Sequence, residues 1–388
     1  MKILLMDAML AIGSRRRTAF LPWLLVLLLT ALCAAPGWAA VRQTAAGPVS
    51  VEKVAGDLDT PWGLAFLPGG AFLVTERDGT LFHFDAKRRR IKISGVPEVY
   101  AWGQGGLMDV AAARDFPETR EIFLTYSKRH ARGGGGTALA VAALSADNRK
   151  LENLRVIFEM AAPSRGGRHF GSRVVEAGDG TLYLTLGERG DPDTSQDLSL
   201  HNGKIIRVRR DGSVPPDNPF VGRAGARPEI WSLGHRNPQG AALDANGALW
   251  AVEHGARGGD EINRVRKGAN YGWPVISYGR HYWGGKIGVG TAKEGMEQPA
   301  FYWDPSIAPC GMEIYSGKLR PAWRGHFFVS SLKYDHISRL DPAGGFREVE
   351  RLAFPETGRV RDVIEAPDGS LWFLSEERGA VYRITPLR

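Results

Sequence analysis

A turn followed by a short strand of alternating apolar and aromatic residues recurs six times along this chain. The turns are marked by Gly or Asp, and the spacing is of the order of fifty to seventy-five residues, narrowing towards the end. The repeats occupy Gly69–Asp85, Thr119–Lys128, Gly178–Glu188, Ala245–Gly255, Arg324–Asp341 and Asp368–Ile384. Repeats of this size, built from several short strands, are typical of a β-propeller. The sequence therefore predicts an all-β, six-bladed β-propeller.

A β-sandwich is the alternative all-β fold, but six similar hairpin-bearing units fit it poorly. The ring of a propeller must be closed between its last and first blades. An unpaired edge strand is a liability, because it exposes backbone hydrogen-bonding groups. We therefore expect Val49–Val54 to pair in the last blade. The longest insertions between repeats, Pro192–Gly225 and Gly255–Ser316, are expected to lie over one end of the central channel.

The N-terminus carries the pattern of a secretory signal. Three arginines (15–17) precede a nearly continuous apolar run, Phe20–Cys33, and small residues follow up to Ala40. We expect residues 1–39 to be a cleaved signal peptide and residues 40–388 a single propeller domain. The alternative is a retained membrane anchor, but the apolar run is short for a span of about 20 residues. Leu32 argues against lipid attachment at Cys33, and both the general and the twin-arginine export routes stay open.

Charge and cysteine content narrow the class of protein. Cleavage after residue 39 removes four basic residues and one acidic residue, so the formal net charge falls from +8 to +5. The excess is spread along the chain, which does not indicate nucleic-acid binding. Cys310 is the one cysteine left, so no internal disulfide is possible, and a buried apolar role is its simplest interpretation.

The stretch Pro228–Pro274 concentrates polar residues among turn-forming Gly, Pro and Asn. Within it, Arg236 and Asn237 are adjacent, and a guanidinium suits carboxylates or a developing oxyanion. Gly255 and Ala256 offer turn carbonyls of the kind that Ca²⁺ accepts. On its own, Arg236 is also consistent with a structural ion pair. The two carbonyls alone are only a weak indication of a calcium site.

His169 stands just before a predicted strand, among Gly166, Gly167 and Gly171. Histidine is the side chain whose ordinary pKa suits proton abstraction near neutral pH. A structural histidine is the common alternative, but the open, glycine-rich backbone favours a site. His254 is set aside as a base in favour of His169, and His235 is interpreted as structural.

Arg359 and Arg361 are two residues apart, so a strand would direct both to one face. Two such cations repel one another unless an anion lies between them, and a small polycarboxylate would satisfy them. Solvated surface arginines are the alternative. Lys333 and Gln104, which is flanked by glycines, are further candidate polar contacts. The sequence contains no nucleotide-binding glycine fingerprint, zinc spacing or hydrolase nucleophile motif.

Six motifs in one order resemble the soluble periplasmic quinoprotein sugar dehydrogenases, the aldose and glucose dehydrogenases that use pyrroloquinoline quinone (PQQ). The resemblance runs from Leu58 to the end of the chain. The motifs are GQGGLMDVA, RHFGSRVV with LTLGERG, LHNGKIIRV, GHRNPQG, GGDEINRVRKGANYGWP and GRVRDVIEAPDGSLW. The resemblance implies a six-bladed propeller that binds PQQ at the channel mouth with Ca²⁺ beneath the cofactor.

The resemblance also implies residue roles. His169 is expected to take the proton of the sugar hydroxyl, with Arg236 and Asn237 beside the reactive quinone carbonyl. The carbonyls of Gly255 and Ala256 are expected to bind Ca²⁺. The other expected cofactor contacts are Gln104, Ser306, Lys333, Arg359 and Arg361. Arg168 stands where glucose-specific members carry Asp, which points to the broader aldose type.

We therefore expect PQQ- and Ca²⁺-dependent oxidation of an aldose to a lactone, with electrons passed to an external acceptor. The protein is expected to be periplasmic or secreted, a monomer or homodimer, without a nucleic-acid partner and without stable membrane insertion after cleavage. Two alternatives stay open on the same fold: a non-catalytic propeller that binds a glycan or protein, and a calcium-dependent lactonase.

Overall fold

The computed structural model describes residues 39–131, 133–161 and 164–387. The predicted signal peptide, up to Trp38, lies outside these residues. In the described part, no helix is long and apolar enough to cross a membrane. Strands dominate, and the helical elements are single turns. These turns are η1 (Pro68–Gly70), α1 (Phe116–Thr119), η2 (Pro192–Gln196) and η3 (Pro321–Trp323).

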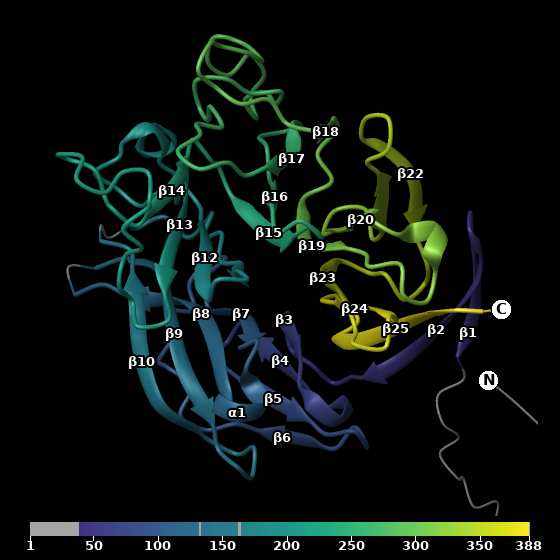
Figure 1. The fold of residues 1–388 in the computed structure, drawn as a ribbon. Coiled ribbons are helices and arrows are strands. Elements are labelled where there is room, and N and C mark those ends of the chain that lie inside the picture. Colours follow the sequence, from purple (N-terminus) through teal and green to yellow (C-terminus); the bar gives the residue numbers. More distant parts are fainter. Residues whose placement is uncertain (1–38, 132, 162–163, 388) are drawn as a thin grey trace, which may run out of the picture. The chain divides into compact units, whose positions relative to one another are not determined.

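Six antiparallel sheets follow one another around a central channel, which confirms the predicted six-bladed propeller (Figure 1). Within each of the first five blades, the chain runs from the inner strand to the outer strand. Blade 1 consists of β3 (Pro61–Phe66), β4 (Phe72–Glu76), β5 (Leu81–Phe84) and β6 (Arg90–Lys92). Blade 2 consists of β7 (Leu107–Ala112), β8 (Glu121–Arg129), β9 (Gly135–Leu144) and β10 (Leu151–Glu159). Blade 3 consists of β11 (Val174–Glu176), β12 (Thr181–Leu186), β13 (Lys204–Arg209) and β14 (Ile230–Leu233). Blade 4 consists of β15 (Pro238–Leu243), β16 (Leu249–Glu253), β17 (Asp260–Arg264) and β18 (Phe301–Trp303). Blade 5 consists of β19 (Pro309–Ile314), β20 (Phe327–Ser331), β21 (Ile337–Asp341) and β22 (Arg347–Leu352).

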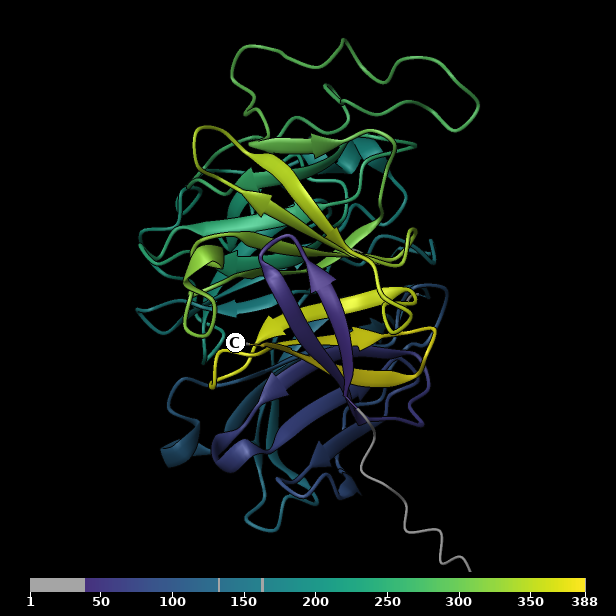
Figure 2. The same cartoon turned by 90° about the vertical axis from the view of Figure 1, so that its right-hand side faces the viewer.

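The sixth blade closes the ring with the N-terminal strand of the domain. Its strands are β23 (Val360–Glu365), β24 (Leu371–Ser375), β25 (Ala380–Pro386), β2 (Gly47–Ala55) and β1 (Ala40–Thr44). Strand β2 pairs antiparallel with β25, with Val51 opposite Ile384, as Figure 2 shows for the purple and yellow strands. The predicted closure through Val49–Val54 is therefore confirmed.

The apolar core lies between blades. One cluster joins Leu73 and Leu81 of blade 1 to Leu124 and Ala140 of blade 2. Similar clusters fill the interfaces between blades 2 and 3, 3 and 4, 4 and 5, 5 and 6, and 6 and 1. The second strands of three blades, β4, β20 and β24, are buried at every residue. Stacked blades bury one another's faces, so no blade needs to be stable alone.

The predicted insertions are only partly right. Within Pro192–Gly225, residues 204–209 form β13, and the following loop lies at the far end of the blade, where Arg210 bonds Glu176 at the end of β11. Only the segment before β13 joins the candidate site. The second insertion contains the whole of β17, β18 and β19. The connection between β17 and β18 extends away from the sheets (Figure 2, green).

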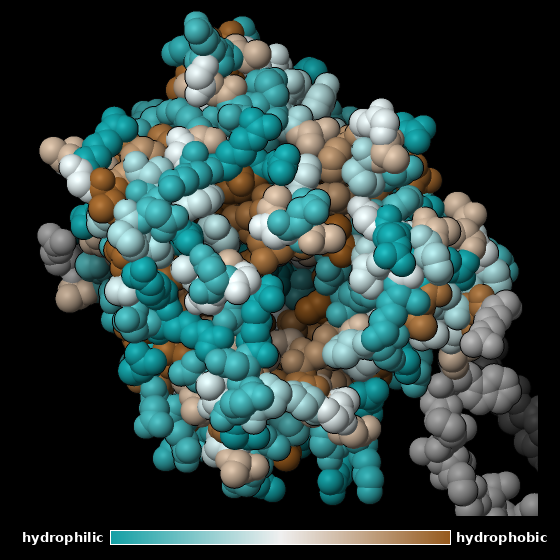
Figure 3. Space-filling view, viewed as in Figure 1, coloured by the Kyte–Doolittle hydropathy of each residue, from teal (hydrophilic) through white to brown (hydrophobic). Residues whose placement is uncertain are grey.

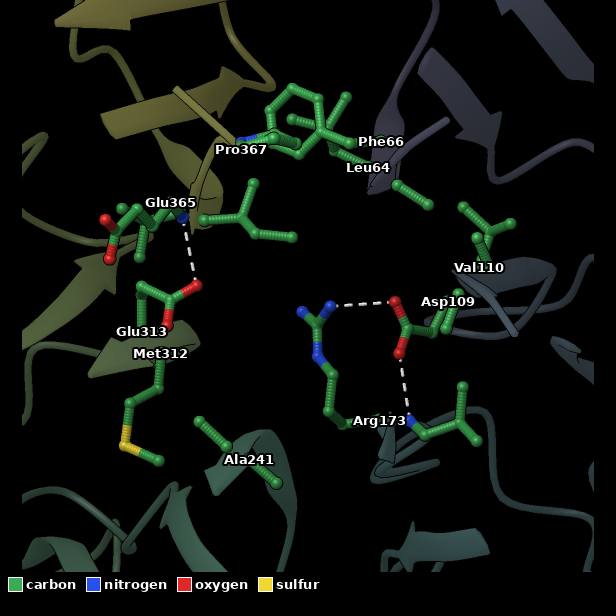
Figure 4. A pocket seen from close by; sticks show the side chains of 17 residues that line it. Leu64, Phe66, Asp109, Val110, Arg173, Ala241, Met312, Glu313, Glu365 and Pro367 are labelled. Atoms are coloured by element: carbon green, nitrogen blue, oxygen red, sulfur yellow. Dashed lines mark hydrogen bonds and ion pairs between the residues drawn. The ribbon is translucent and has the colours of Figure 1, made fainter. Parts of the chain in front are cut away.

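The channel is divided by a buried ion-pair cluster. Arg173, at the start of β11, donates to Asp109 at 2.7 Å and to Asp362 at 3.0 Å. A cavity of about 410 Å³ lies on the side of the cluster towards the C-terminal ends of the inner strands, lined by Leu64, Val110 and Met312 among others (Figure 4). The face in Figure 3 is hollowed at its centre, with apolar side chains inside the hollow.

Candidate active site

Two neighbouring cavities lie at the N-terminal ends of the inner strands. The first, the cationic cavity, has a volume of about 350 Å³ and is named for its basic lining residues Arg77, Lys333, Arg359 and Arg361. The second, the histidine cavity, has a volume of about 520 Å³ and contains His169. His169 lines the second cavity and Gly171 the first, so the two adjoin at this segment. Both volumes are typical of sites for small molecules and cofactors.

His169 is held in an uncommon backbone conformation before β11. Its φ is +55°, in the left-handed region, where a non-glycine residue requires support from its surroundings. Its N–H donates to Oε1 of Gln104 at 2.7 Å, and the guanidinium of Arg189 donates to the carbonyl of Arg168. A Cβ at Gly187 would collide with the carbonyl oxygen of His169, so that position requires glycine. These contacts fix the imidazole at the cavity wall.

Glu188 determines which ring nitrogen of His169 carries the proton. Its carboxylate Oε1 lies in hydrogen-bond contact with Nδ1 of His169. Because a carboxylate accepts only, Nδ1 carries the proton and Nε2 is left with a lone pair. Burial lowers the pKa of His169 below its ordinary value, and the hydrogen bond to Glu188 opposes part of that shift. The imidazole is therefore neutral at neutral pH, as a base must be.

Arg236 reaches the histidine cavity from the turn before β15. Its backbone N–H donates to Glu253 at 2.7 Å, and its guanidinium lies over Trp273, 5.3 Å from the ring centroid. Nη1 donates to the carbonyl of Gly255 at 2.6 Å. The neighbouring His235 is fully buried between Glu253 and Ser232, consistent with the structural role predicted for it.

Asn237 and Ser306, both predicted cofactor contacts, line neither cavity. Asn237 is buried, and its Oδ1 accepts the N–H of Gly171 at 3.1 Å. The hydroxyl of Ser306 donates to the carboxylate of Asp260 at 2.7 and 2.8 Å. Asn237 thus supports the glycine that separates the two cavities, whereas Ser306 is engaged by a buried carboxylate.

The cationic cavity brings together Gln104, Lys333, Arg359 and Arg361 from three different blades. Arg77, which no sequence motif indicated, lines it as well. In the described part of the chain, neither Arg77 nor Lys333 forms an ion pair, and the Nζ of Lys333 lies 4.8 Å from the ring centroid of Tyr334. Trp62, Met108 and Phe170 form an apolar cluster beside these cations. The cavity therefore suits a flat, anionic ligand.

The predicted geometry of Arg359 and Arg361 is wrong in one respect. Arg359 precedes β23 with a φ of +46°, so the two side chains do not share a strand face. The anion between them is Glu376, which accepts from Nε of Arg359 at 2.8 Å and from Nη2 of Arg361 at 2.6 Å. Burial alone would raise the pKa of Glu376, but the two guanidinium groups outweigh it and lower that pKa. A bound polycarboxylate is not needed to relieve their repulsion.

Ala256 lines the histidine cavity and Gly255 precedes it in the chain, and each of the two carbonyl oxygens already has one donor. The Gly255 oxygen accepts from Arg236, and that of Ala256 accepts the N–H of Arg280 at 2.8 Å. Each keeps a second lone pair. Among the described residues, no group of three His, Cys, Asp or Glu side chains is arranged to hold a metal ion.

Several buried polar atoms around these cavities have no hydrogen-bond partner in the described part of the chain. They are Oε2 of Glu188, Nε of Arg236, Nδ2 of Asn237 and Nε2 of His254. Leaving such a group unpaired costs about 1–3 kcal/mol, so their concentration at one place indicates a ligand site. Burial lowers the pKa of His254 to about 3, so this side chain is neutral.

Comparisons with known proteins match this chain to sugar dehydrogenases. The family model for glucose/sorbosone dehydrogenase matches residues 58–383. The chain is similar to the aldose sugar dehydrogenase YliI of Escherichia coli (strain K12), with 42% identity over 93% of this chain and 97% of that protein. The crystal structure of the soluble aldose sugar dehydrogenase from E. coli in the apo-form has a TM-score of 0.85 and 42% identity, covering 87% of this chain and 100% of that one. The PQQ-bound aldose sugar dehydrogenase of Streptomyces coelicolor has a TM-score of 0.71 and 29% identity, covering 89% of this chain and 99% of that one.

Proposed function

The chain belongs to the glucose/sorbosone dehydrogenase family, and from that premise we propose that it oxidises aldoses at the anomeric carbon to lactones, using PQQ and Ca²⁺. The observation that carries this proposal is the placement of His169. A neutral, Glu188-oriented imidazole stands at the junction between a cavity open to a substrate and a cavity lined by cations. A non-catalytic binding propeller does not need such a base.

The proposed oxidation balances with PQQ as the acceptor of the hydride. Nε2 of His169 accepts the proton of the anomeric hydroxyl, and the hydrogen on the anomeric carbon leaves as hydride, so that carbon becomes a lactone carbonyl. PQQ, when bound, supplies the hydride acceptor and later passes the electrons to an external acceptor. Arg236 lines the same cavity, so its guanidinium can stabilise negative charge that develops there.

The residues of the cationic cavity fit PQQ. PQQ carries several carboxylates, and Arg77 and Lys333 are cations without ion-pair partners among the described residues. Arg361 is already paired with Glu376, so its guanidinium would be shared between Glu376 and a carboxylate of PQQ. Outside the lining of this cavity, Nδ2 of Asn237 and Nε of Arg236 are buried donors that lack acceptors in the described part of the chain. A planar ligand would also cover Trp62 and Phe170.

The fit to Ca²⁺ is narrower. Ca²⁺ prefers oxygen ligands, and Gly255 and Ala256 offer carbonyl oxygens. Because Nη1 of Arg236 donates to the Gly255 oxygen, a bound ion would share that oxygen with the guanidinium or displace it. Ca²⁺ would act there as a Lewis acid towards a cofactor carbonyl.

We further propose that residues 1–39 direct export and that the mature protein works in the periplasm or outside the cell. The pattern of arginines, an apolar run and small residues supports this location. Its electron acceptor is external to the chain, and its assembly as a monomer or a homodimer is left open.

Reconstitution tests the proposed function. The apo-protein is mixed with PQQ, Ca²⁺, glucose and a redox dye, and dye reduction is followed in a complete mixture and in mixtures that lack PQQ, Ca²⁺ or sugar. We expect sustained dye reduction only in the complete mixture, and chelation of Ca²⁺ should abolish it. Saturable glycan binding without dye reduction would support the binding-propeller alternative and overturn the enzyme. Hydrolysis of a lactone in the absence of PQQ would support the lactonase.

Replacing Lys333 by alanine is expected to raise the dissociation constant for PQQ roughly tenfold, about 1.4 kcal/mol. The reason is that Lys333 faces the cationic cavity without an ion-pair partner in the described residues. Turnover at saturating PQQ should fall less than affinity does, because Lys333 lines the cationic cavity whereas His169 lines the histidine cavity. Fluorescence titration with PQQ measures the affinity. Lys92→Ala, which removes an exposed lysine from β6, is the matched control. Equal PQQ affinity in both variants would remove Lys333 from the cofactor site.

A further inference from the structure

A cavity at the opposite end of the channel from the candidate active site takes no part in the proposed oxidation. This far cavity has a volume of about 410 Å³ and lies towards the C-terminal ends of the inner strands (Figure 4). All six inner strands contribute to its wall, through Leu64, Val110, Val174, Ala241, Met312 and Val363. Its volume falls in the range of about 300–1,000 Å³ that is typical of sites for small molecules.

The wall of the far cavity is largely apolar. Leu64, Val110 and Met312 are buried, and Figure 4 shows them around an open centre. Ala241 and Ala242 of β15 have short side chains and leave space beside them. Burial of apolar surface is favourable in water, so such a wall favours a ligand with a hydrocarbon or aromatic body.

The inner end of the far cavity is formed by Arg173, which is 8% exposed and projects into the centre of Figure 4. Nε donates to the carbonyl of Gln239, Nη1 donates to Asp109 and Asp362, and Nη2 donates to Asp362. One of the five N–H groups therefore has no partner in the described part of the chain. The guanidinium lies over the ring of Trp62, 5.0 Å from the centroid, and no other described ring stacks on it. A guanidinium in this position can stack on the aromatic ring of a ligand.

The charge of the far cavity is negative. Arg173 is its one cationic lining residue, and two aspartates already pair with it. Glu313 and Glu365 also line the cavity, and neither forms an ion pair among the described residues. The carboxylate of Glu313 accepts only backbone N–H groups, those of Ile314 and Glu365, each at 2.9 Å. Burial raises the pKa of Glu313 to about 7, and the nearby charge of Glu365 adds to the rise. A cation beside Glu313 would supply the missing counter-charge.

We propose that the far cavity is a second ligand site for a small aromatic amine, whose ammonium group pairs with Glu313 and whose ring packs between Met312 and the guanidinium of Arg173. An anionic ligand would meet more carboxylates than cations there. A neutral apolar ligand would leave Glu313 without a counter-ion. The site is separate from the proposed oxidation, because the ion-pair cluster of Arg173 lies between the far cavity and Trp62, which lines the cationic cavity.

The test uses tryptamine as the probe. Indole-3-propionate has the same ring with a carboxylate in place of the ammonium group, so it is the charge-reversed comparison. Binding to the purified protein and to Glu313→Gln is measured by isothermal titration calorimetry at about pH 8, where Glu313 is mostly ionised. We expect saturable binding of tryptamine, about tenfold weaker binding of indole-3-propionate, and about tenfold weaker binding of tryptamine to Glu313→Gln. Glu118→Gln changes an exposed carboxylate of α1 outside the cavity and should bind tryptamine like the wild type.

A second variant, Ala242→Leu, narrows the far cavity without changing its charge and should also weaken tryptamine binding. It keeps the test decisive if Glu313→Gln fails to fold, which thermal unfolding would register. Absence of saturable tryptamine binding, or equal affinity for the two indoles, would overturn the proposal. Tryptamine binding that neither Glu313→Gln nor Ala242→Leu weakens would place the amine elsewhere on the protein and overturn it as well. Aldose oxidation, measured by dye reduction, stands or fails independently of these results.

Discussion

Replacing His169 by glutamine is expected to lower kcat for aldose oxidation by about 10²- to 10⁴-fold, the usual contribution of a positioned general base. Glutamine keeps a polar side chain of similar reach but cannot take up a proton at neutral pH. The PQQ affinity should change little, because His169 lines the histidine cavity and not the cationic cavity. The measurements are steady-state kinetics with a dye acceptor and a PQQ titration on the same preparation.

The matched control is His326→Gln, which changes a partly buried histidine before β20 that lines neither cavity. It should retain both turnover and PQQ binding. A His169→Gln variant that turned over at the wild-type rate would remove His169 from the role of base. Loss of PQQ binding together with turnover would instead indicate that the left-handed backbone before β11 had collapsed, which thermal unfolding would register.

The second large effect is expected from Glu188→Gln, which should lower kcat about 100-fold or more. The carboxylate accepts the proton of Nδ1 of His169, and a group that fixes the imidazole tautomer in this way has a large effect on turnover. An amide can present either an acceptor or a donor to the ring, so the orientation of the base is no longer enforced. Glu188 is a positioning residue and does not need to touch the substrate.

The pH profile separates this role from a purely structural one. The base works when deprotonated, so kcat/KM falls on the acid side as pH drops through the pKa of His169, which burial places below its ordinary value of about 6.5. The bond to Glu188 raises that pKa, so its loss should move the acid limb of Glu188→Gln to still lower pH. Reduced turnover with an unchanged acid limb would mean that Glu188 acts on folding alone. Unchanged turnover would show that it does not orient the base.

The fold was predictable because its signal is repeated. Six turn-and-strand units specify six blades, and the edge-strand argument placed Val49–Val54 beside the last of them, where β2 pairs with β25. The insertions were less well predicted: β13 (Lys204–Arg209), although glycine turns at Gly203 and Gly212 bound it, was included in the first of them. Strand pairing across a sheet is not visible in a local sequence pattern.

The sequence predicted those residues of the candidate site that lie in recognisable motifs. The sequence indicated His169, Arg236 and three of the cations, Lys333, Arg359 and Arg361, which the fold brings to one end of the channel, but it did not indicate Arg77. The partners of these residues were missed, because they come from other strands and depend on packing. Glu188 and Glu376 are carboxylates in ordinary turns, and only the fold shows that one orients His169 and the other joins Arg359 to Arg361.

The central claim is that this chain oxidises an aldose at its anomeric carbon with bound PQQ as the immediate acceptor. A single-turnover experiment without dye or any other acceptor tests it most directly. Protein loaded with PQQ and Ca²⁺ is mixed with glucose labelled with ¹³C at the anomeric carbon, and the product is followed by NMR while the bound cofactor is followed by absorbance. The prediction is labelled lactone, or the gluconate formed by its hydrolysis, equimolar with the reduced cofactor, and greatly slowed formation in His169→Gln. Glucose left unchanged by the fully loaded wild type would contradict the claim.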